Sequence, residues 1–236
     1  MKRNVLLSML TLLAASLFAA DSTPKDDVTA AAKKLGDQAN YSWTTTVTVP
    51  EGSRFRPGPT DGQTEKDGVT HVTMSFRDTK MEAYLKGDKG AITNPDGGWD
   101  SLADMENEEG PGRFMVRRFR DYKAPAAEAA DLVAGVKEVK KADDAYSGDM
   151  TEDAAKGLLS FRGRGGGDNG PTISGAKGSV KFWVKDGMLT KYEFKVEGKV
   201  EFNGNERDVD RTTTVEIKDV GSTKITVPDE AKKKLS

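Results

Sequence analysis

The 236-residue sequence contains no cysteine and a single histidine, His71. The lack of cysteine excludes disulfide bonds, a thiol nucleophile, cysteine metal ligands and a lipid-acceptor cysteine. Zinc sites are built mainly from cysteine and histidine, and this chain offers a single histidine for both types of ligand. We therefore expect neither a metal nor a cofactor. A hydrolytic triad would have to use His71, but no sequence motif identifies a nucleophile or a carboxylate that would act with this histidine. We therefore expect an ordinary strand histidine and a protein that is not an enzyme.

Long apolar runs are scarce, and the longest covers residues 5–20, directly after the basic Lys2 and Arg3. A membrane-spanning helix needs about 20 apolar residues, more than this run offers. A short basic region, an apolar stretch and small residues before a polar segment are typical of a secretory signal peptide. We predict a signal peptide over residues 1–20 and a periplasmic or secreted protein. The absence of disulfides favours a bacterial envelope.

The charge balance is close to neutral. Removal of residues 1–20 lowers the number of basic residues from 36 to 34, against 38 acidic ones. A mildly acidic chain is poorly suited to binding nucleic acid by bulk charge. The remaining residues 21–236 have the length of one domain with a sizeable core, and we expect a monomer.

The first half predicts one helix and several strands. Ser22 or Thr23 can cap a helix that ends near Gly36. Strands are predicted where β-favouring and polar residues alternate, over residues 41–49, 69–77 and 80–87. Residues 91–102 add a short strand, a Pro-Asp-Gly turn and a tryptophan. The Pro- and Gly-rich residues 50–68 predict a long loop.

Helical signals follow in the middle of the chain. We predict two helices over residues 113–135, divided near Pro125, and a third over residues 151–161, capped by Thr151. Residues 138–150 between them predict an irregular strand.

The last third predicts successive hairpins. Asp186-Gly187 and Asn203-Gly204 are strong turn signals between alternating segments, and residues 222–228 predict a final strand. These strands carry one apolar and one polar face, so the apolar face needs a cover. The sequence therefore predicts an α+β fold, an antiparallel β meander covered by the helices of residues 113–161.

The glycine-rich residues 161–180 contain Gly170 and Gly175 at the spacing of a phosphate-binding loop. However, Ala176 separates the second glycine from Lys177, and the stretch lies after a helix and before a strand, the reverse of the order that such a loop requires. We interpret the stretch as a long, mobile connector rather than a nucleotide site.

Two charged segments are candidate sites. The acidic residues 104–110 lack the spacing of a calcium-binding EF-hand loop, so a solvated acidic loop is the simpler interpretation. The basic residues 112–123 carry aromatic side chains at helical spacing. They can form a lid that meets acyl chains and anionic headgroups, or a packed amphipathic helix with a solvated basic face.

The order of elements resembles the LolA-like superfamily of bacterial envelope proteins, which includes the outer-membrane lipoprotein carrier and mycobacterial lipid-binding lipoproteins. The residues that carry the resemblance are Trp183, Gly187 and Leu189 in the hairpin, and Asp219, Gly221, Ile225 and Pro228 at the end of the chain. The resemblance implies an open half-barrel whose apolar concave face, covered by helices, holds acyl chains without catalytic residues. The chain departs from the mycobacterial members by lacking their lipoprotein cysteine.

On this basis we predict a non-catalytic carrier that binds a lipid or the acyl chain of a protein, with envelope membrane components as further partners. The predicted cavity lining consists of side chains from apolar strand faces and from the lid, namely Trp43, Met74, Phe76, Phe114, Met115, Phe119, Phe182, Tyr192 and Phe194. Arg117 and Arg118 are predicted to meet a headgroup at the mouth. The alternative is an envelope structural or interaction module, in which the same faces close into a core without a ligand cavity.

Overall fold

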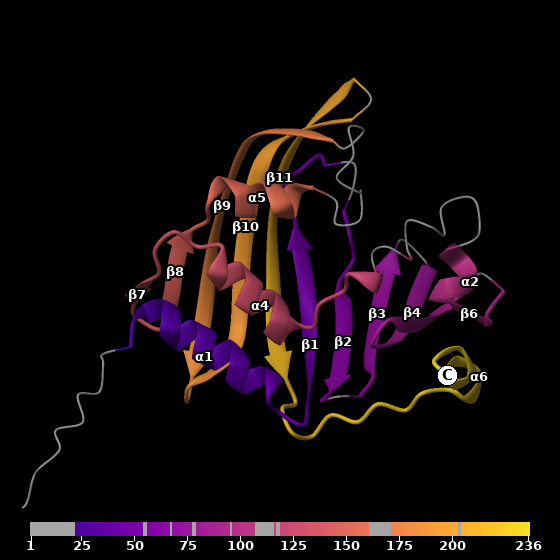
Figure 1. Ribbon diagram of the computed structural model, residues 1–236. Helices are drawn as coiled ribbons and strands as arrows, with labels where there is room; N and C mark the ends of the chain where they lie inside the picture. The colour runs from indigo at the N-terminus through magenta and orange to yellow at the C-terminus, as the bar shows by residue number, and fades with distance from the viewer. Residues whose placement is uncertain are drawn as a thin grey trace, which may run out of the picture.

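The protein forms a single large antiparallel sheet with helices on its concave side (Figure 1). In this computed structural model the described residues are 22–53, 56–66, 68–76, 79–94, 96–106, 116, 119–160, 171–202 and 204–236. The eleven strands follow the order β6-β5-β4-β3-β2-β1-β11-β10-β9-β8-β7. Because β6 and β7 stand at opposite ends of this order, the sheet is open. The predicted α+β class and the open, helix-covered sheet are confirmed.

The strands vary from three to fifteen residues. Their bounds are β1 (Asn40–Thr48), β2 (Thr60–Glu65), β3 (Thr70–Phe76), β4 (Thr79–Lys86), β5 (Lys89–Thr93), β6 (Trp99–Ser101), β7 (Lys140–Ala142), β8 (Ala145–Asp149), β9 (Thr172–Lys185), β10 (Met188–Phe202) and β11 (Asn205–Lys218). The helices are α1 (Pro24–Gly36), α2 (Leu102–Glu106), α4 (Pro125–Ala134), α5 (Glu152–Leu159) and α6 (Asp229–Lys234).

Helix α1 begins as its sequence predicts. The Thr23 side chain accepts a hydrogen bond from the Asp26 amide, and the Asp26 carboxylate in turn accepts one from the Thr23 amide. This capping box satisfies two amides that an uncapped helix would leave without partners. The buried face of the helix consists of small and branched apolar residues, namely Val28, Ala31, Ala32 and Leu35. It packs on α4 and on β10.

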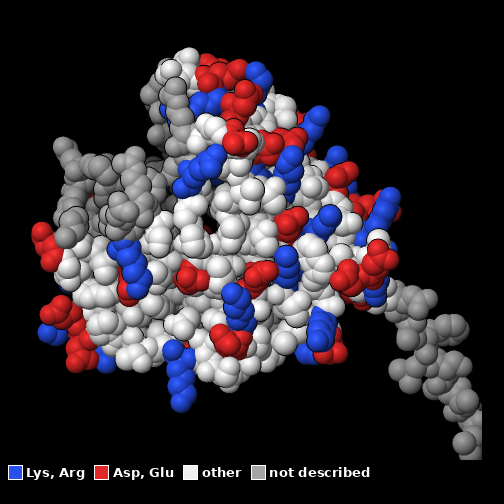
Figure 2. All heavy atoms as spheres, turned by 180° about the vertical axis from the view of Figure 1, so that it is seen from behind, with Lys and Arg blue, Asp and Glu red and all other residues white. Residues whose placement is uncertain are grey.

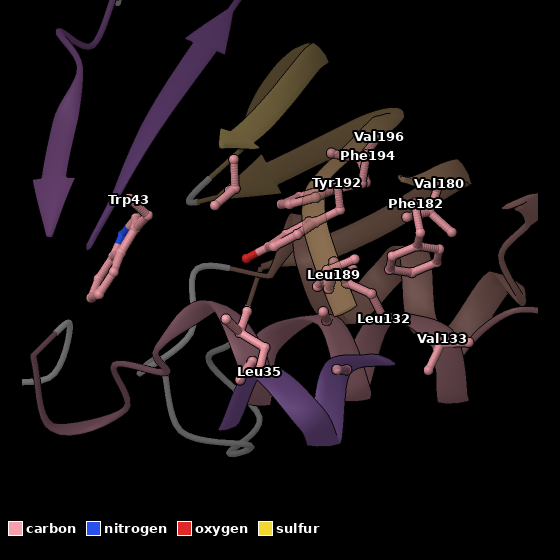
Figure 3. Close-up of a cluster of buried hydrophobic side chains, with 14 of the residues drawn as sticks. Leu35, Trp43, Leu132, Val133, Val180, Phe182, Leu189, Tyr192, Phe194 and Val196 are labelled. Atoms are coloured by element: carbon pink, nitrogen blue, oxygen red, sulfur yellow. The ribbon is translucent and has the colours of Figure 1, made fainter. Parts of the chain in front are cut away.

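The main core lies between the sheet and the helices α1, α4 and α5. Trp43, Phe182 and Tyr192 are the largest fully buried side chains in it. Figure 3 shows Phe182, Tyr192 and Phe194 on the strands, facing Leu132 and Leu35 of the helices, with Trp43 at a distance along the sheet. Seen from behind, the molecule carries charged residues of both signs, interspersed among uncharged ones (Figure 2).

Strands β9 and β10 form the predicted hairpin across Asp186 and Gly187, whose φ angles are 54° and 70°. This pair of positive φ values belongs to the turn that best matches the twist of a hairpin. Further along, Gly198 of β10 allows α5 to approach, because a Cβ there would lie 2.7 Å from Leu159. The hairpin curves over α5 at this level (Figure 1).

The C-terminal strap, residues 222–236, lies on the other face of the sheet. By strand alternation Tyr84 and Ala91 point away from the main core, and they form a second cluster with Ala231 of α6. Val69, Trp99, Ile225, Val227 and Leu235 pack around this cluster. The strap therefore covers an apolar patch on β4 and β5.

Three sequence predictions are corrected. Residues 50–68 are not only a loop, since β2 occupies Thr60–Glu65. Residues 222–228 do not form a strand, because amides of this segment bond to the Asn40 and Glu65 side chains. The glycine-rich stretch is not a connector throughout, since β9 begins at Thr172. Its residues 161–170 lie outside the described residues, as do the signal segment and most of the first predicted lid helix.

Candidate functional site

A cavity of about 190 Å³ lies between α4 and α5 on the concave side of the sheet. Its lining is mainly apolar and comes from α4, α5 and the residue that joins β8 to α5, namely Asp131, Leu132, Met150, Ala154, Gly157 and Leu158. Asp131 and Gly157 are exposed, so the cavity reaches the surface where the two helices meet. The Asp131 carboxylate at this rim forms an ion pair with Lys123.

Helix α5, which forms one wall, is short and held at both ends. The Thr151 side chain accepts a hydrogen bond from the Ala154 amide at the N-terminus, as the sequence predicts. At the C-terminus the Arg211 guanidinium of β11 donates to the Leu158 carbonyl at 2.6 Å. Between them, Gly157 has no heavy atom within 4 Å of the place where a Cβ would stand. A larger side chain at this position would therefore extend into open space.

Two tyrosines of the sheet hold α4 by polar contacts. The Tyr192 hydroxyl donates to Glu128 Oε2 at 2.7 Å, and the Tyr41 hydroxyl accepts from the Ala126 amide at 3.3 Å. Burial raises the pKa of Tyr41 to about 12. Burial, helped by the Glu128 charge, raises the pKa of Tyr192 well above its ordinary value. Both hydroxyls are therefore neutral over the physiological range.

A third tyrosine holds the other cover helix. The Tyr146 hydroxyl of β8 donates to Asp27 of α1 at 3.1 Å. Lys25 of the same helix donates to the carbonyls of Ala134, the last residue of α4, and of Val136 beyond it. Helices α1 and α4, which cover the sheet, are therefore joined to the sheet and to each other by hydrogen bonds as well as by apolar packing.

The predicted lining residues whose side chains the structure describes lie in the main core. Six of them have 0–9% of their surface exposed, namely Trp43, Met74, Phe119, Phe182, Tyr192 and Phe194. None of these lines the cavity between α4 and α5. The side chain of Phe76, and Phe114, Met115, Arg117 and Arg118 as whole residues, lie outside the described residues. Their predicted roles in ligand binding remain predictions.

The residues that line the cavity carry little signal in the sequence. One local signal was available, because Gly157 falls inside a segment that otherwise predicts a helix, where glycine is unfavourable. The remaining lining residues are ordinary helix-facing side chains, and only the packing of α4 beside α5 brings them together.

His71 lies on the face opposite the cavity. Its ring stacks on Tyr84 with 4.3 Å between the ring centres, and its Nε2 lies 3.2 Å from Glu82 Oε2. Gln63 is the other polar partner found for the ring within the described residues. Burial lowers the pKa of His71, although the neighbouring Glu82 acts in the opposite direction. The ring therefore joins three neighbouring strands, β2, β3 and β4.

The described part of the acidic segment is engaged in ion pairs. Asp104 contacts Lys234 at 3.3 Å, and Glu106 contacts Arg120 at 2.7 Å. Across the residues that the structure describes, no group of three or more His, Asp and Glu side chains is placed to hold a metal ion. The helices in the same part of the chain are all too short or too polar to cross a membrane.

No protein-family model and no curated protein sequence matches the chain. Among solved structures, it is similar to the lipoprotein LppX of Mycobacterium tuberculosis, at 10% sequence identity over 87% of this chain and 98% of that one, with a TM-score of 0.47. It is also similar to LprF of Mycobacterium bovis, at 13% identity over 88% and 97% of the two chains, with a TM-score of 0.44.

A LolA superfamily protein from Nitrosomonas europaea is similar as well, at 10% identity over 87% of this chain and 96% of that one, with a TM-score of 0.36. At these identities the likeness concerns the fold alone. The structure itself has the open antiparallel sheet with a helix-covered concave face that the resemblance of the sequence implies.

Proposed function

We propose that the protein binds the hydrocarbon chain of a lipid or of an acylated protein, without chemistry, at a site that opens from the cavity between α4 and α5. The observation that carries this proposal is the apolar lining of that cavity, with Leu132 on one helix and Leu158 on the other. A methylene group moved from water into such a site contributes about 0.8 kcal/mol. An apolar chain is therefore the ligand that this surface favours.

Binding of a hydrocarbon chain at this site would require the helices that cover the sheet to move. Its volume of about 190 Å³ is below the roughly 300–1,000 Å³ typical of ligand pockets. Helix α5 is the element best suited to move, because it has eight residues and buries only Ala155 and Leu159. Displacement of α5 would join the cavity to the apolar face of β9 and β10 beneath it.

The rival proposal is an envelope structural or interaction module with a closed core. The full burial of Phe182 and Tyr192 favours it, since both side chains are 0% exposed beneath the helices. In that case partners would bind on the outside and no ligand would enter.

Mass spectrometry of the natively purified protein separates the two proposals. Co-purified lipid, removed by organic solvent and absent from a denatured control, is expected for a binding protein. Replacement Gly157→Leu is expected to reduce the lipid content, because the side chain would fill the open space beside α5. Gly157→Ala is the matched control and should retain lipid. A lipid-free protein that also fails to take up an apolar fluorescent probe would exclude the binding function.

We further propose that the chain is exported by a signal peptide over residues 1–20 and acts as a monomer in the periplasm or outside the cell. Cell fractionation and the N-terminal sequence of the mature protein test the export. A mature protein that begins at Met1 and stays in the cytoplasm would contradict it.

A further inference from the structure

The hydrogen bond between Tyr192 and Glu128 places a carboxylate in contact with the apolar core. Tyr192 is 0% exposed, and its ring packs near Phe182 and Phe194. Its oxygen points away from Phe182 in Figure 3, and the hydroxyl donates to Glu128 Oε2 at 2.7 Å. The sheet therefore presents a buried hydrogen-bond donor that is satisfied by a side chain of the cover.

Tyr41 adds a second hydroxyl below α4. It accepts a hydrogen bond from the Ala126 amide, which leaves the proton of the hydroxyl for donation. The Tyr41 and Tyr192 hydroxyls bond to Ala126 and Glu128, which lie two positions apart near the start of α4. Polar groups are thus concentrated under the N-terminal half of α4.

The cavity begins one helical turn away from these groups. Glu128 and Leu132 are four residues apart on α4 and therefore neighbours on its surface. Leu132 lines the cavity, whereas Glu128 contacts Tyr192. A chain that extends along α4 from the cavity would therefore reach the level of Glu128, the partner of Tyr192, about one helical turn further on.

We propose that Tyr192, assisted by Tyr41, forms the subsite for the carboxylate of a long-chain fatty acid, whose hydrocarbon tail occupies the cavity beside α5. This inference rests on the proposed function and deepens it by naming the ligand class. The Glu128 carboxylate, carried on two methylene groups, stands in for the carboxylate of the ligand in the closed state.

Energetics favour an acid over a neutral ligand at this subsite. Entry of a ligand beneath α4 separates Glu128 from Tyr192 and would leave a buried hydroxyl without its acceptor, which is unfavourable. The carboxylate of a fatty acid restores a charge-assisted hydrogen bond, whereas a methyl ester offers only a neutral acceptor. The expected preference is about tenfold, the usual difference between a charged and a neutral hydrogen bond.

Equilibrium binding of radiolabelled palmitate and methyl palmitate to the mature protein tests the subsite. The wild type is expected to bind palmitate about tenfold more tightly than the ester. Tyr192→Phe should remove this preference, because palmitate loses a charge-assisted hydrogen bond whereas the ester loses at most a neutral one. Glu128→Gln should bind palmitate more tightly, because the competing carboxylate is gone. Tyr146→Phe is the control, since this hydroxyl bonds to α1, and it should keep the preference.

The outcomes separate this inference from the proposed function. Equal binding of the two ligands by the wild type, or an unchanged preference in Tyr192→Phe, overturns the carboxylate subsite and leaves the binding of hydrocarbon chains intact. Binding of neither ligand contradicts both proposals. If Tyr192→Phe does not fold, Glu128→Gln decides, and palmitate binding no tighter than in the wild type overturns the subsite.

Discussion

The indole ring of Trp43 occupies the space in which a side chain of Gly62 would stand. Trp43 and Gly62 are direct partners on the adjacent strands β1 and β2. A Cβ at Gly62 would lie 2.0 Å from Cζ2 and 2.1 Å from Cε2 of the indole. The largest fully buried side chain of the core therefore depends on the absence of a side chain on the neighbouring strand.

Replacement Gly62→Ala is expected to destabilise the protein by about 1–3 kcal/mol, the usual cost of overpacking a core. The added methyl group would displace the indole, because two ring atoms lie closer to it than any real contact allows. Urea denaturation measures the loss, and tryptophan emission should shift to longer wavelength. Gly157→Ala is the matched control and should stabilise by about 0.5–1 kcal/mol. Equal stability of Gly62→Ala and wild type would disprove the packing argument.

The pair Trp43 and Gly62 also explains which strands could be predicted from the sequence. Strands such as β10 carry their own apolar face, with Tyr192 and Phe194 two residues apart, so alternation identifies them. In β2 the inward position is Gly62, and the apolar group that covers it comes from Trp43. No alternation within residues 50–68 could therefore reveal this strand.

In the C-terminal strap, by contrast, the sequence predicts a strand that does not form. Ile225 and Val227 alternate with polar residues and predict a strand, yet the segment forms none. The Ile225 amide bonds to a Glu65 carboxylate, and the Thr226 carbonyl accepts from Tyr84. The alternation of apolar and polar residues correctly indicates that one side of the segment is buried. It does not indicate that the backbone hydrogen bonds are made with side chains rather than with a neighbouring strand.

The cavity between α4 and α5 could not be predicted from the sequence, because it depends on how the two helices pack. The sequence predicts α5 and α4 separately, with Thr151 as a cap and Pro125 at a helix start. The distance between the two helices depends on how the sheet bends near Gly198, where a Cβ would contact Leu159. A cavity formed by such packing leaves no periodic signal in the chain.

Replacement Ala231→Asp is expected to release the strap from the sheet. Ala231 is 0% exposed between α6 and the patch around Tyr84, and a carboxylate there would lose its hydration. Limited trypsin digestion should cleave after Lys224 at least about tenfold faster, given a local cost of roughly 1–3 kcal/mol. Glu230→Ala, on the exposed side of α6, is the control and should digest like the wild type. Unchanged cleavage of Ala231→Asp would show that the strap does not depend on this contact.

Stability is expected to fall at alkaline pH through Tyr41 and Tyr192. An unfolded tyrosine ionises near pH 10, whereas burial raises the pKa of Tyr41 to about 12 and that of Tyr192 well above 10. Below pH 10 both states hold the protons, so the full stability is present. Above pH 10 only the unfolded state releases them, and each tyrosine lowers the free energy of unfolding by about 1.4 kcal/mol per pH unit. For Tyr41 this loss ends near pH 12.

Urea denaturation at several pH values between 9 and 11 measures the alkaline slope. Tyr41→Phe and Tyr192→Phe should each remove about half of the tyrosine contribution above pH 10, because neither replacement can ionise. Their stability below pH 10 falls by about 1 kcal/mol for each lost hydrogen bond. An alkaline slope that persists in the double variant would assign the loss to other groups.

Arg211 is expected to control the opening of α5. It lies on the concave face of β11, opposite Val196, and donates to the Leu158 carbonyl in the last turn of the helix. Carbonyls at this end have no partner within the helix, so the guanidinium supplies one. Arg211→Met keeps the apolar stem but removes the donors, and it should weaken the docking of α5 by about 1.5–3 kcal/mol.

Hydrogen exchange measured by mass spectrometry tests this role directly. Peptides that cover Glu152–Leu159 should exchange roughly 10–100 times faster in Arg211→Met, as expected from that loss in local stability. Peptides of α1 report the rest of the cover and should not change. Arg207→Met, an exposed arginine on the same strand, is the matched control. If α5 exchanges equally in all three proteins, the helix is held by Ala155 and Leu159 alone, and movement of α5 would require the apolar contact itself to break.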